Sequence, residues 1–528
     1  MAENTGVEVE FVLDGLVVAP DPAVAAVAVD HAILDRWGPW LPGMVREALT
    51  SAAGRKGLGV HHTPPDVVAE VLDHAERTGL TWDDTTTVLD PSVGGGAFLL
   101  AAAERLPGDR AAVIERLAGV DIDPLAVATT IAALTLWAGV APSPTRFVVG
   151  DFLAIDPWPD PVDVVVGNPP FLSQLRAGTA RSDDRRAWLA ERWPGVGRYV
   201  DDAMAFALAS VDATRTGGAV VLIQPTSVLG ATDAEPVRAR LAETAPLAGL
   251  WVDRARRFAA SVDTVAIVLR PGVRGGSVRV GEHTVVGPAA ASWAPLLATA
   301  TGTPTVVVDS TRTLGDVAHV TAGFRDQFYG LRGAVDDDPT GTHPLVTSGS
   351  IDPLRLRWGE RVTRFDKRPY RHPVVELDRV EPGIRSWVDA RLVPKVLVAS
   401  QTKVIEALID DAGVLVPGTP VVSVEPSSPE IGTARVAALL TSPVASARLA
   451  AVAAGTALSA DSVRVSARLL ADLPLPIDDD AWGRAAERAT AGDVLGCGRA
   501  MLVAHGLGDR SDILEWWTGR MPTNSLGN

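Results

Sequence analysis

Short apolar segments alternate with helix-forming segments from Val88 to about residue 272, and this alternation constrains the fold more than any other feature of the 528-residue chain. Seven of the apolar segments have the length and composition of strands: TTTVLD, RLAGVDID, RFVVGDF, VDVVVGNPPF, GGAVVLIQP, LAGLWVD and DTVAIVLR. Helix-forming segments such as PLAVATTIAALTLWAG and AEPVRARLAET separate them. Alternation of this kind predicts an α/β domain in which helices cover both faces of a parallel sheet.

The alternation ends well before the chain does, and a chain of this length is too long for one ordinary hydrophobic core. After residue 272 a Gly- and Val-rich stretch is typical of a hairpin, and from about residue 315 strands, turns and a few helices mix irregularly. We therefore predict five parts: a helical N-terminal segment (1–55), an α/β domain (56–272), a linker (273–314), an α+β domain (315–478) and a helical C-terminal segment (479–528).

Composition is that of a globular protein in a reducing compartment. Hydrophobic residues make up 47% and charged residues 21% of the chain. There is no run of about 18 apolar residues, and the acidic N-terminus lacks the start of a secretory signal. A single cysteine, Cys497, excludes a disulfide framework and a multi-cysteine zinc site. We expect a cytoplasmic protein without a membrane segment. The net charge of −16 disfavours nonspecific polyanion binding over the whole surface.

The first two strand ends carry a glycine turn and an acid. VLDPSVGGGAFLLAA (Val88–Ala102) places three glycines after a strand, where backbone can approach a ligand closely. No Lys-Ser/Thr pair follows them, which disfavours a phosphate-loop ATPase. In GVDIDP, Asp121 ends the next strand, where an acid can bind both hydroxyls of a ribose. On these residues a nicotinamide enzyme and an S-adenosylmethionine enzyme are both open.

The next two strand ends bear on the choice between these two classes of enzyme. In GDF, the carboxylate of Asp151 can accept from an adenine amino group and the ring of Phe152 can stack on the base. GNPPF follows the fourth strand. Prolines fix the backbone and cannot donate, so the Asn168 side-chain oxygen and the Pro169 carbonyl can act as two fixed acceptors. Two acceptors suit an amino group with two hydrogens, and Phe171 offers a face for a planar base or amide.

Taken in order, HHTPPDVVAEVLD, DPSVGGGAF, GVDIDP, GDF and GNPPF resemble the motifs of the γ-class amino-methyltransferases that act on adenine in DNA. The resemblance continues through residues 200–230 and RRFAASVDTVAIVL, and covers about residues 55–272. It implies a Rossmann-like S-adenosylmethionine-dependent methyltransferase sheet, followed by a C-terminal α+β target-recognition domain. It also implies that the target adenine is flipped out of double-stranded DNA and methylated at N6 without a metal.

The resemblance carries site roles onto matching residues of this chain. The catalytic clamp on the target base comprises Asn168, Pro169, Pro170 and Phe171. The implied cofactor-binding residues are Thr63, Pro64, Asp90, Pro91, Gly94, Gly96, Phe98, Asp121, Ile122, Asp151 and Phe152. Phe258 stands where the family often has a second aromatic against the flipped base. The chain departs from the family in having Phe rather than Tyr after the prolines, and Val93 where Ala or Cys is common.

One basic, aromatic-rich segment stands out in the second domain. RLRWGERVTRFDKRPYR (355–371) holds seven basic residues interleaved with Trp358, Phe365 and Tyr370, a pattern that suits DNA phosphates and guanine edges. The surrounding motifs resemble target-recognition domains of fused restriction–modification enzymes. The expected DNA-binding residues are Arg325, Arg355, Arg357, Arg361, Arg364, Lys367, Arg368, Arg371 and Lys403.

None of the four lysines follows an acid at a spacing of two, as the usual metal-dependent nuclease motif requires. We therefore expect a nucleoid-associated methyltransferase without its own endonuclease: half of a restriction–modification pair, part of a phage-defence system, or a solitary epigenetic enzyme. A separate endonuclease or another defence-system subunit is the expected protein partner. The alternatives are a methyltransferase acting on RNA or protein glutamine, a silent DNA-binding specificity subunit, and a dinucleotide oxidoreductase, which leaves the clamp unexplained.

Overall fold

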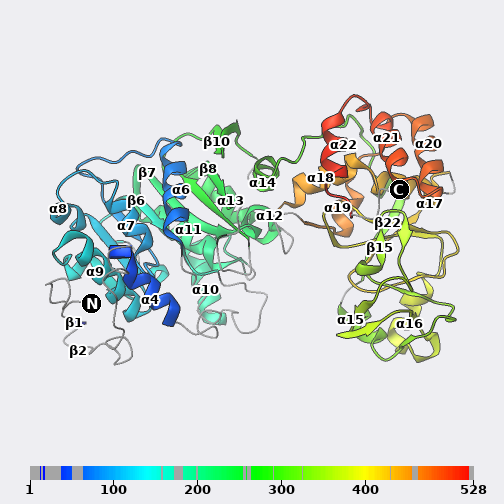
Figure 1. The fold of residues 1–528 in the computed structure, drawn as a ribbon, viewed down its shortest axis with the longest axis horizontal. Coiled ribbons are helices and arrows are strands. Elements are labelled where there is room, and N and C mark those ends of the chain that lie inside the picture. The colour runs from blue at the N-terminus through cyan, green and yellow to red at the C-terminus, as the bar shows by residue number, and fades with distance from the viewer. Residues whose placement is uncertain are drawn as a thin grey trace. The chain divides into compact units, whose positions relative to one another are not determined.

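The protein was analysed as a computed structural model, which describes residues 12–13, 16–17, 37–49, 63–155, 158–171, 182–197, 200–253, 257, 263–288, 291–323, 325–428, 430–454 and 462–522. The chain divides into two compact units, Met1–Leu296 and Leu297–Asn528 (Figure 1). The division falls inside the stretch predicted as a linker (273–314). The predicted hairpin within that stretch forms, but as part of the first unit, where it extends the sheet at one edge.

A nine-stranded sheet forms the centre of the first unit. Its strands are β3 (Val88–Asp90), β4 (Leu117–Asp121), β5 (Phe147–Val149), β6 (Val162–Gly167), β7 (Thr214–Pro225), β8 (Leu247–Val252), β9 (Thr264–Leu269), β10 (Ser277–Val280) and β11 (His283–Val286), in the order β11-β10-β8-β9-β7-β6-β3-β4-β5. The seven strands predicted between residues 88 and 272 are β3 to β9.

The prediction of a parallel sheet was wrong for β9. Strands β5, β4, β3, β6 and β7 are parallel neighbours, but β9 is antiparallel to both β7 and β8. Only 11 residues, 253–263, separate β8 from β9, which is fewer than the dozen or more that a crossover between parallel strands needs, so β9 pairs antiparallel with β8. The apolar composition of β9 could not reveal this, because a central strand is buried on both faces whichever way it runs.

Helices cover both faces of this sheet, as predicted. The helices of the first unit are α4 (Leu41–Leu49), α6 (Pro65–Glu76), α7 (Ala97–Ala103), α8 (Arg110–Ile114), α9 (Pro124–Ala138), α10 (Asp183–Arg192), α11 (Asp202–Asp212), α12 (Ser227–Gly230) and α13 (Glu235–Thr244), and the boundary between the units falls within α14 (Ala294–Ala300). Helices α6, α7 and α9 share one core with Val164, Val166 and Val221. The alternate side chains of the same strands, Val165 and Leu222, are also fully buried, and α11 packs against β7.

Two hydrophobic cores hold most of the buried apolar residues described in the second unit. In the larger, α17 (Gly432–Leu440) packs on the antiparallel sheet β12 (Ala318–Ala322), β24 (Val422–Pro426), β20 (Lys395–Val398) and β22 (Ala407–Asp410). Around it lie α18 (Pro443–Ala453), α19 (Ala467–Ala471), α20 (Asp479–Thr490), α21 (Val494–Ala504) and α22 (Ser511–Thr518) (Figure 1). The smaller core lies between α15 (Arg325–Leu331), α16 (Pro382–Asp389) and the ladder of β13 (Val335–Asp337) with β19 (Pro373–Val375).

Four further two-stranded ladders complete the strands of the second unit. They pair β14 (Leu345–Val346) with β23 (Val416–Pro417), β15 (Ile351–Asp352) with β16 (Arg355–Leu356), β17 (Thr363–Phe365) with β18 (Arg368–Tyr370), and β21 (Gln401–Thr402) with β25 (Val463–Arg464). In the described part of the chain, no single helix combines the length and apolar character needed to cross a membrane. Helices α17 and α18 meet that test only together, as a pair bent by 54°.

Candidate functional site

The strand order of the first unit reverses between β3 and β6. From β3 the chain adds β4 and β5 on one side, and it then returns to add β6 and β7 on the other. Open α/β sheets bind ligands at such a reversal, outside the carboxyl ends of the strands. Asp90 ends β3 and Gly167 ends β6, and a Cβ placed on Gly167 would lie only 2.7 Å from Asp90 Oδ1. Only glycine allows the two strand ends to approach this closely.

The Asp90 carboxyl is buried directly beneath this reversal. It is 1% exposed, and its Oδ1 accepts a hydrogen bond of 2.9 Å from the backbone N–H of Ser92. Burial, with a smaller contribution from the neighbouring Asp121 charge, raises the pKa of Asp90 to about 8. The carboxyl therefore keeps its proton near neutral pH until a cation or a donor reaches it.

The glycine turn connects the ends of β3 and β4. Gly94 and Gly96 have φ angles of +53° and +82°, a region that side chains with a Cβ rarely adopt. Gly96 begins α7 as its N-cap. The backbone N–H of Gly94 donates to Asp121 Oδ2 at 3.0 Å, while the N–H of Asp123 donates to Asp121 Oδ1 at 3.0 Å. Two backbone donors thus hold the Asp121 carboxylate in one orientation.

An apolar side chain stands exposed beside this carboxylate. Ile122 is 61% exposed, although it directly follows the largely buried strand β4. Burial raises the pKa of Asp121, and the hydrogen bonds from Asp123 and Gly94 and the charge of Arg46 oppose that shift. A fixed carboxylate next to an exposed aliphatic face can bind a ligand that has both hydroxyls and a flat apolar ring.

Two aromatic side chains predicted to bind the cofactor lie in the core instead. Phe152 is 3% exposed and its ring stacks on that of Phe206, with centroids 6.0 Å apart. Phe98 is 2% exposed on α7 and belongs to the core cluster under the sheet. The Asp151 carboxylate accepts from Leu153 N at 3.0 Å and pairs with Arg185 at 2.6 Å. Stacking by Phe152 on a base therefore remains a prediction that requires its ring to move.

The Asn-Pro-Pro-Phe segment begins directly after β6. Asn168 is half-buried, and its Nδ2 donates a hydrogen bond of 3.0 Å to Thr63 Oγ1. Thr63 is 5% exposed and immediately precedes Pro64, the N-cap of α6. Because Thr63 accepts from the amide nitrogen, the side-chain amide of Asn168 is held in one orientation. Pro169 is buried, and Phe171 packs partly against the core.

The loop that carries Phe258 is anchored to the same helix. Phe258 itself lies outside the described residues, and so do His61 and His62. Its neighbour Arg257 donates to Glu70 at 2.6 and 2.8 Å and to Asp66 at 3.0 Å, both on α6. The N–H of Arg257 also donates to Asp253 Oδ2 at 2.7 Å. Helix α6 therefore links Thr63, the partner of Asn168, to the residue that precedes Phe258.

In the second unit, the predicted basic segment is not one exposed surface. Asp352, 2% exposed, binds Arg357 at 2.7 Å and Arg361 at 3.0 Å. Glu360 binds Arg357 at 2.8 Å and Arg355 at 3.0 Å. Arg357 is only 8% exposed, so the prediction that it faces DNA is corrected. Its charge compensates the buried carboxylate of Asp352, an arrangement that spacing along the chain could not reveal.

The aromatic residues of the same segment also have structural contacts. Phe365 is 3% exposed in the smaller core, where Tyr370 packs against it. The indole N–H of Trp358 donates to the carbonyl of Pro373 at 2.8 Å. These rings stabilise the fold around the segment rather than present stacking faces for bases.

Exposed basic side chains remain on the hairpin of β17 and β18. Arg364, Lys367 and Arg368 are all exposed there, while the neighbouring Asp366 pairs with Arg332 at 2.5 Å. The hairpin borders a cavity of about 510 Å³ that is lined by Phe328, Thr347, Ser348, Gly349, Arg361, Val362, Thr363, Arg364, Phe365, Asp366, Thr419 and Pro420. The lining of this cavity is partly apolar, and the exposed cations beside it are suited to a polyanion.

The other predicted DNA-binding residues lie around this hairpin or on separate loops. Arg371 is exposed and its Nε donates to the carbonyl of Gly359 at 3.1 Å. Lys403 is exposed in the turn between β21 and β22. Arg325 begins α15, and its side chain lies outside the described residues.

Part of the first unit is similar to a known protein family. A family model described as N-6 DNA Methylase matches residues 45–252, which include every strand end described above. The match covers less than half of the chain, and the matched region, residues 45–252, is called the methylase domain below. The predicted resemblance to adenine-specific DNA methyltransferases of restriction–modification systems is thereby confirmed for this methylase domain.

Individual known proteins are similar to this chain over different lengths. The Type II methyltransferase M.XamI of Xanthomonas campestris pv. amaranthicola is 28% identical over 142 residues, which are 26% of this chain and 24% of that protein. The Type IIL restriction-modification enzyme MmeI, solved in complex with DNA, superposes with a TM-score of 0.57 at 11% identity, covering 93% of this chain and 80% of that one. The type IIG restriction endonuclease BpuSI gives a TM-score of 0.42 at 13% identity. The MmeI match confirms the predicted fold.

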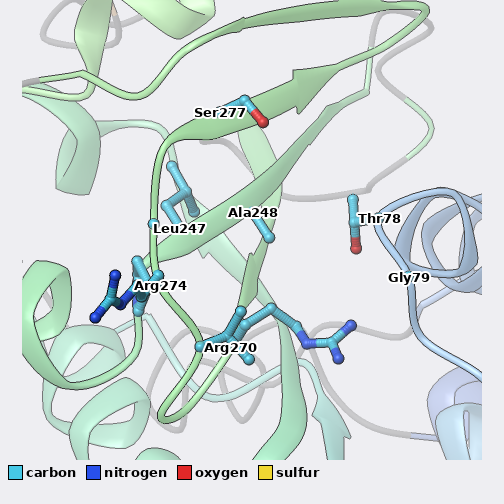
Figure 2. A pocket seen from close by; sticks show the side chains of 10 residues that line it. Thr78, Gly79, Leu247, Ala248, Arg270, Arg274 and Ser277 are labelled. Carbon is cyan, nitrogen blue, oxygen red and sulfur yellow. The ribbon is translucent and has the colours of Figure 1, made fainter.

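The methylase domain also contains a pocket far from the predicted site. It has a volume of about 190 Å³ and is lined by Thr78, Gly79, Pro246, Leu247, Ala248, Arg270, Val273, Arg274, Gly275 and Ser277 (Figure 2). It lies where β8 and β10 begin and β9 ends. This is the sheet edge opposite the carboxyl ends of β3, β4 and β6, so the pocket is not part of the Asn168 site.

Several residues of the methylase site were not anticipated from the sequence. They are Gly167, which lies beside Asp90; Arg185, which pairs with Asp151; Arg257, which pairs with Glu70 of α6; and Gly43 and Arg46, which belong to α4. Gly43 did carry a signal, because a glycine within a helix-forming segment often marks a close packing contact. Each arginine is separated from its partner by 34 or more residues, and no local pattern predicts such a pairing.

Proposed function

We propose that this chain transfers a methyl group from S-adenosylmethionine to the N6 amino group of adenine at a specific site in double-stranded DNA. The observation that carries the proposal is the Asn168 amide at the end of β6, oriented by its hydrogen bond to Thr63. It lies next to the strand reversal formed by Asp90 and Gly167. The family of residues 45–252 and the similarity to M.XamI support the same reaction.

The clamp acts on the hydrogens of the target amino group. An exocyclic amino group offers two donors, and the Asn168 Oδ1 and the Pro169 carbonyl are two acceptors on adjacent residues. Accepting both hydrogens draws the nitrogen towards sp³ geometry and makes its lone pair available for attack. Neither proline can donate a competing hydrogen bond. The proposed acceleration comes from positioning of the amino group and from stacking on Phe171.

The strand ends fit S-adenosylmethionine, which supplies an electrophilic methyl group when bound. The glycine turn at Gly94 and Gly96 brings backbone close to a ligand. The fixed Asp121 carboxylate suits the two ribose hydroxyls, and the 61% exposed Ile122 side chain suits one face of the adenine ring. The buried Asp90 carboxyl can ionise to meet the positive charge of the methionine end.

The second unit is proposed to recognise the DNA sequence. Its exposed hairpin cations, Arg364, Lys367 and Arg368, suit backbone phosphates, and the cavity beside them, with its mixed polar and apolar lining, suits base edges. A target adenine must leave the duplex to enter the Asn168 clamp, so base flipping is part of the proposal. MmeI, which was solved bound to DNA, shares its fold with both units and supports this role. A restriction–modification or phage-defence context, with a separate endonuclease, is proposed on the same basis.

The experiment is expression of the chain and of an Asn168→Ala variant in a host that lacks DNA methylation, followed by long-read sequencing. We expect N6-methyladenine at one recurrent sequence with the native chain, and none with the variant. Purified native protein should transfer labelled methyl groups to the same duplex. Transfer to RNA or to protein glutamine in place of DNA would contradict the proposed substrate. An equally methylated Asn168→Ala sample would contradict the proposed clamp.

A further inference from the structure

Helix α4 lies directly on the glycine turn of the methylase domain, although it belongs to a different part of the chain. A Cβ placed on Gly95 would lie 2.7 Å from the Cα of Gly43, and a Cβ placed on Gly43 would lie 2.8 Å from the carbonyl oxygen of Gly95. Backbone therefore packs against backbone at this point. Neither residue can carry a side chain unless helix and turn move apart.

The same helix holds the loop after β4. Arg46 Nη2 bonds Asp123 Oδ2 at 2.6 Å, and the side chains are only 10% and 30% exposed. The backbone N–H of Asp123 donates to Asp121 at 3.0 Å, and its other carboxylate oxygen caps α9 by accepting from Leu125 N at 2.9 Å. Arg46 therefore fixes the residue that orients the Asp121 carboxylate.

We propose that α4 is a positioning element of the cofactor site. Gly43 fixes the position of the glycine turn, and Arg46 fixes the loop that carries Asp121 and Asp123. The inference rests on the proposed S-adenosylmethionine activity. Helix α4 contacts the two strand ends that must bind one ligand together, one through Gly43 and the other through Arg46. Gly43 and Arg46 are three residues apart and so lie on one face of the helix.

The physical reason is preorganisation. A ligand that spans two loops binds more weakly when it must first order them. With Arg46 in place, the Asp121 carboxylate is already aimed by two backbone donors. Without Arg46, Asp123 loses a short, partly buried ion pair, and the loop of Asp121 becomes free to shift at a cost paid from cofactor affinity.

The test measures the affinity of the full-length protein for S-adenosylmethionine and S-adenosylhomocysteine by calorimetry at a temperature where every variant is folded. We expect Arg46→Met to raise the Kd about tenfold, and Arg46→Lys to recover most of the loss. We expect Gly43→Ala to weaken binding at least as much. Ala48→Ser, on an exposed position of the same helix, should bind as the native protein does.

Turnover distinguishes positioning from a general loss of stability. We expect Arg46→Met to raise the KM for S-adenosylmethionine and to leave kcat at saturation nearly unchanged. A merely structural Arg46 would lower the melting temperature and leave the Kd of the folded protein unaltered, and that result would overturn the inference. If Gly43→Ala fails to fold, the two Arg46 variants still decide the matter. Failure of the native chain to bind either ligand would instead overturn the proposed cofactor, and the inference with it.

Discussion

The two acids at the strand ends have different environments, and the difference sets what each can do. Asp121 is held by two backbone donors, while Asp90 is 1% exposed and accepts one hydrogen bond from Ser92 N. Burial raises the pKa of Asp90 to about 8. Ionisation of a buried carboxyl that has few hydrogen-bond donors destabilises the folded state. The protonation of Asp90 therefore links the free energy of unfolding of the methylase domain to pH.

Substitution of Asp90 should change that pH dependence. In the unfolded chain the carboxyl loses its proton near pH 4, and in the folded protein near pH 8. Between these values the folded state binds more protons, so the free energy of unfolding falls as pH rises. We expect the melting temperature of Asp90→Asn to fall less than that of the native protein between pH 6 and pH 8.5. Calorimetric scans at steps of about one pH unit measure this difference. Parallel curves for the two proteins would contradict this reading of Asp90.

The hydrogen bond between Thr63 and Asn168 gives a second prediction at the same scale. Removal of the Thr63 hydroxyl leaves the amide nitrogen of Asn168 without this acceptor, so the amide can rotate out of the clamp. We expect Thr63→Val to lower kcat about tenfold to a hundredfold, since misplaced clamps cost rate on that order. Thr63→Ser keeps the hydroxyl and should stay within about threefold of the native value. The measurement is methyl transfer to duplex DNA under saturating substrates, and equal kcat values for Val and Ser would refute the role of the bond.

At the scale of elements, the basic residues in and before the hairpin of β17 and β18 fall into two groups. One group forms ion pairs with carboxylates, and the other is exposed on the hairpin. The network around Asp352 engages Arg355, Arg357 and Arg361 through carboxylates. The exposed hairpin cations are Arg364, Lys367 and Arg368. The seven basic residues of this segment looked alike in the sequence because the sequence does not show which of them the nearby carboxylates of Asp352 and Glu360 engage.

Neutralisation of the hairpin should weaken DNA binding without altering the fold. We expect the triple change of Arg364, Lys367 and Arg368 to Gln to reduce the slope of log affinity against log salt by up to about three, roughly one per lost phosphate contact. The charge-matched control changes the exposed arginines 484, 488 and 499 on α20 and α21 to Gln. Fluorescence anisotropy over a salt series measures both. Equal slopes for the two triple variants would remove the hairpin from the DNA interface.

At the scale of the molecule, the two units have separate cores and should respond separately to ligand and to heat. The core beneath α6, α7 and α9 belongs to the methylase domain, and that around α17, α20 and α21 belongs to the second unit. Cys497 is fully buried in the latter, and burial raises the pKa of its thiol to about 12. A thiol of this kind is unreactive until its surroundings unfold.

We therefore expect two transitions on thermal unfolding. S-adenosylhomocysteine binds only the folded methylase domain and should raise one melting temperature by mass action. Labelling of Cys497 by iodoacetamide should follow the other transition and be insensitive to the ligand. Calorimetry with and without ligand, alongside a labelling series over temperature, measures both. One cooperative transition that moves as a whole would show instead that the two units unfold together.

The sequence by itself determined the seven central strands, their covering helices and the four strand ends that carry the site, because burial on both faces and backbone-restricting Gly and Pro leave a local pattern. It could not determine that β9 runs antiparallel, since burial does not depend on strand direction. Folding alone placed the ring of Phe152 against that of Phe206 in the core and packed α4 on the glycine turn. These are contacts between residues that the chain brings together only by folding, and short-range patterns carry no record of them.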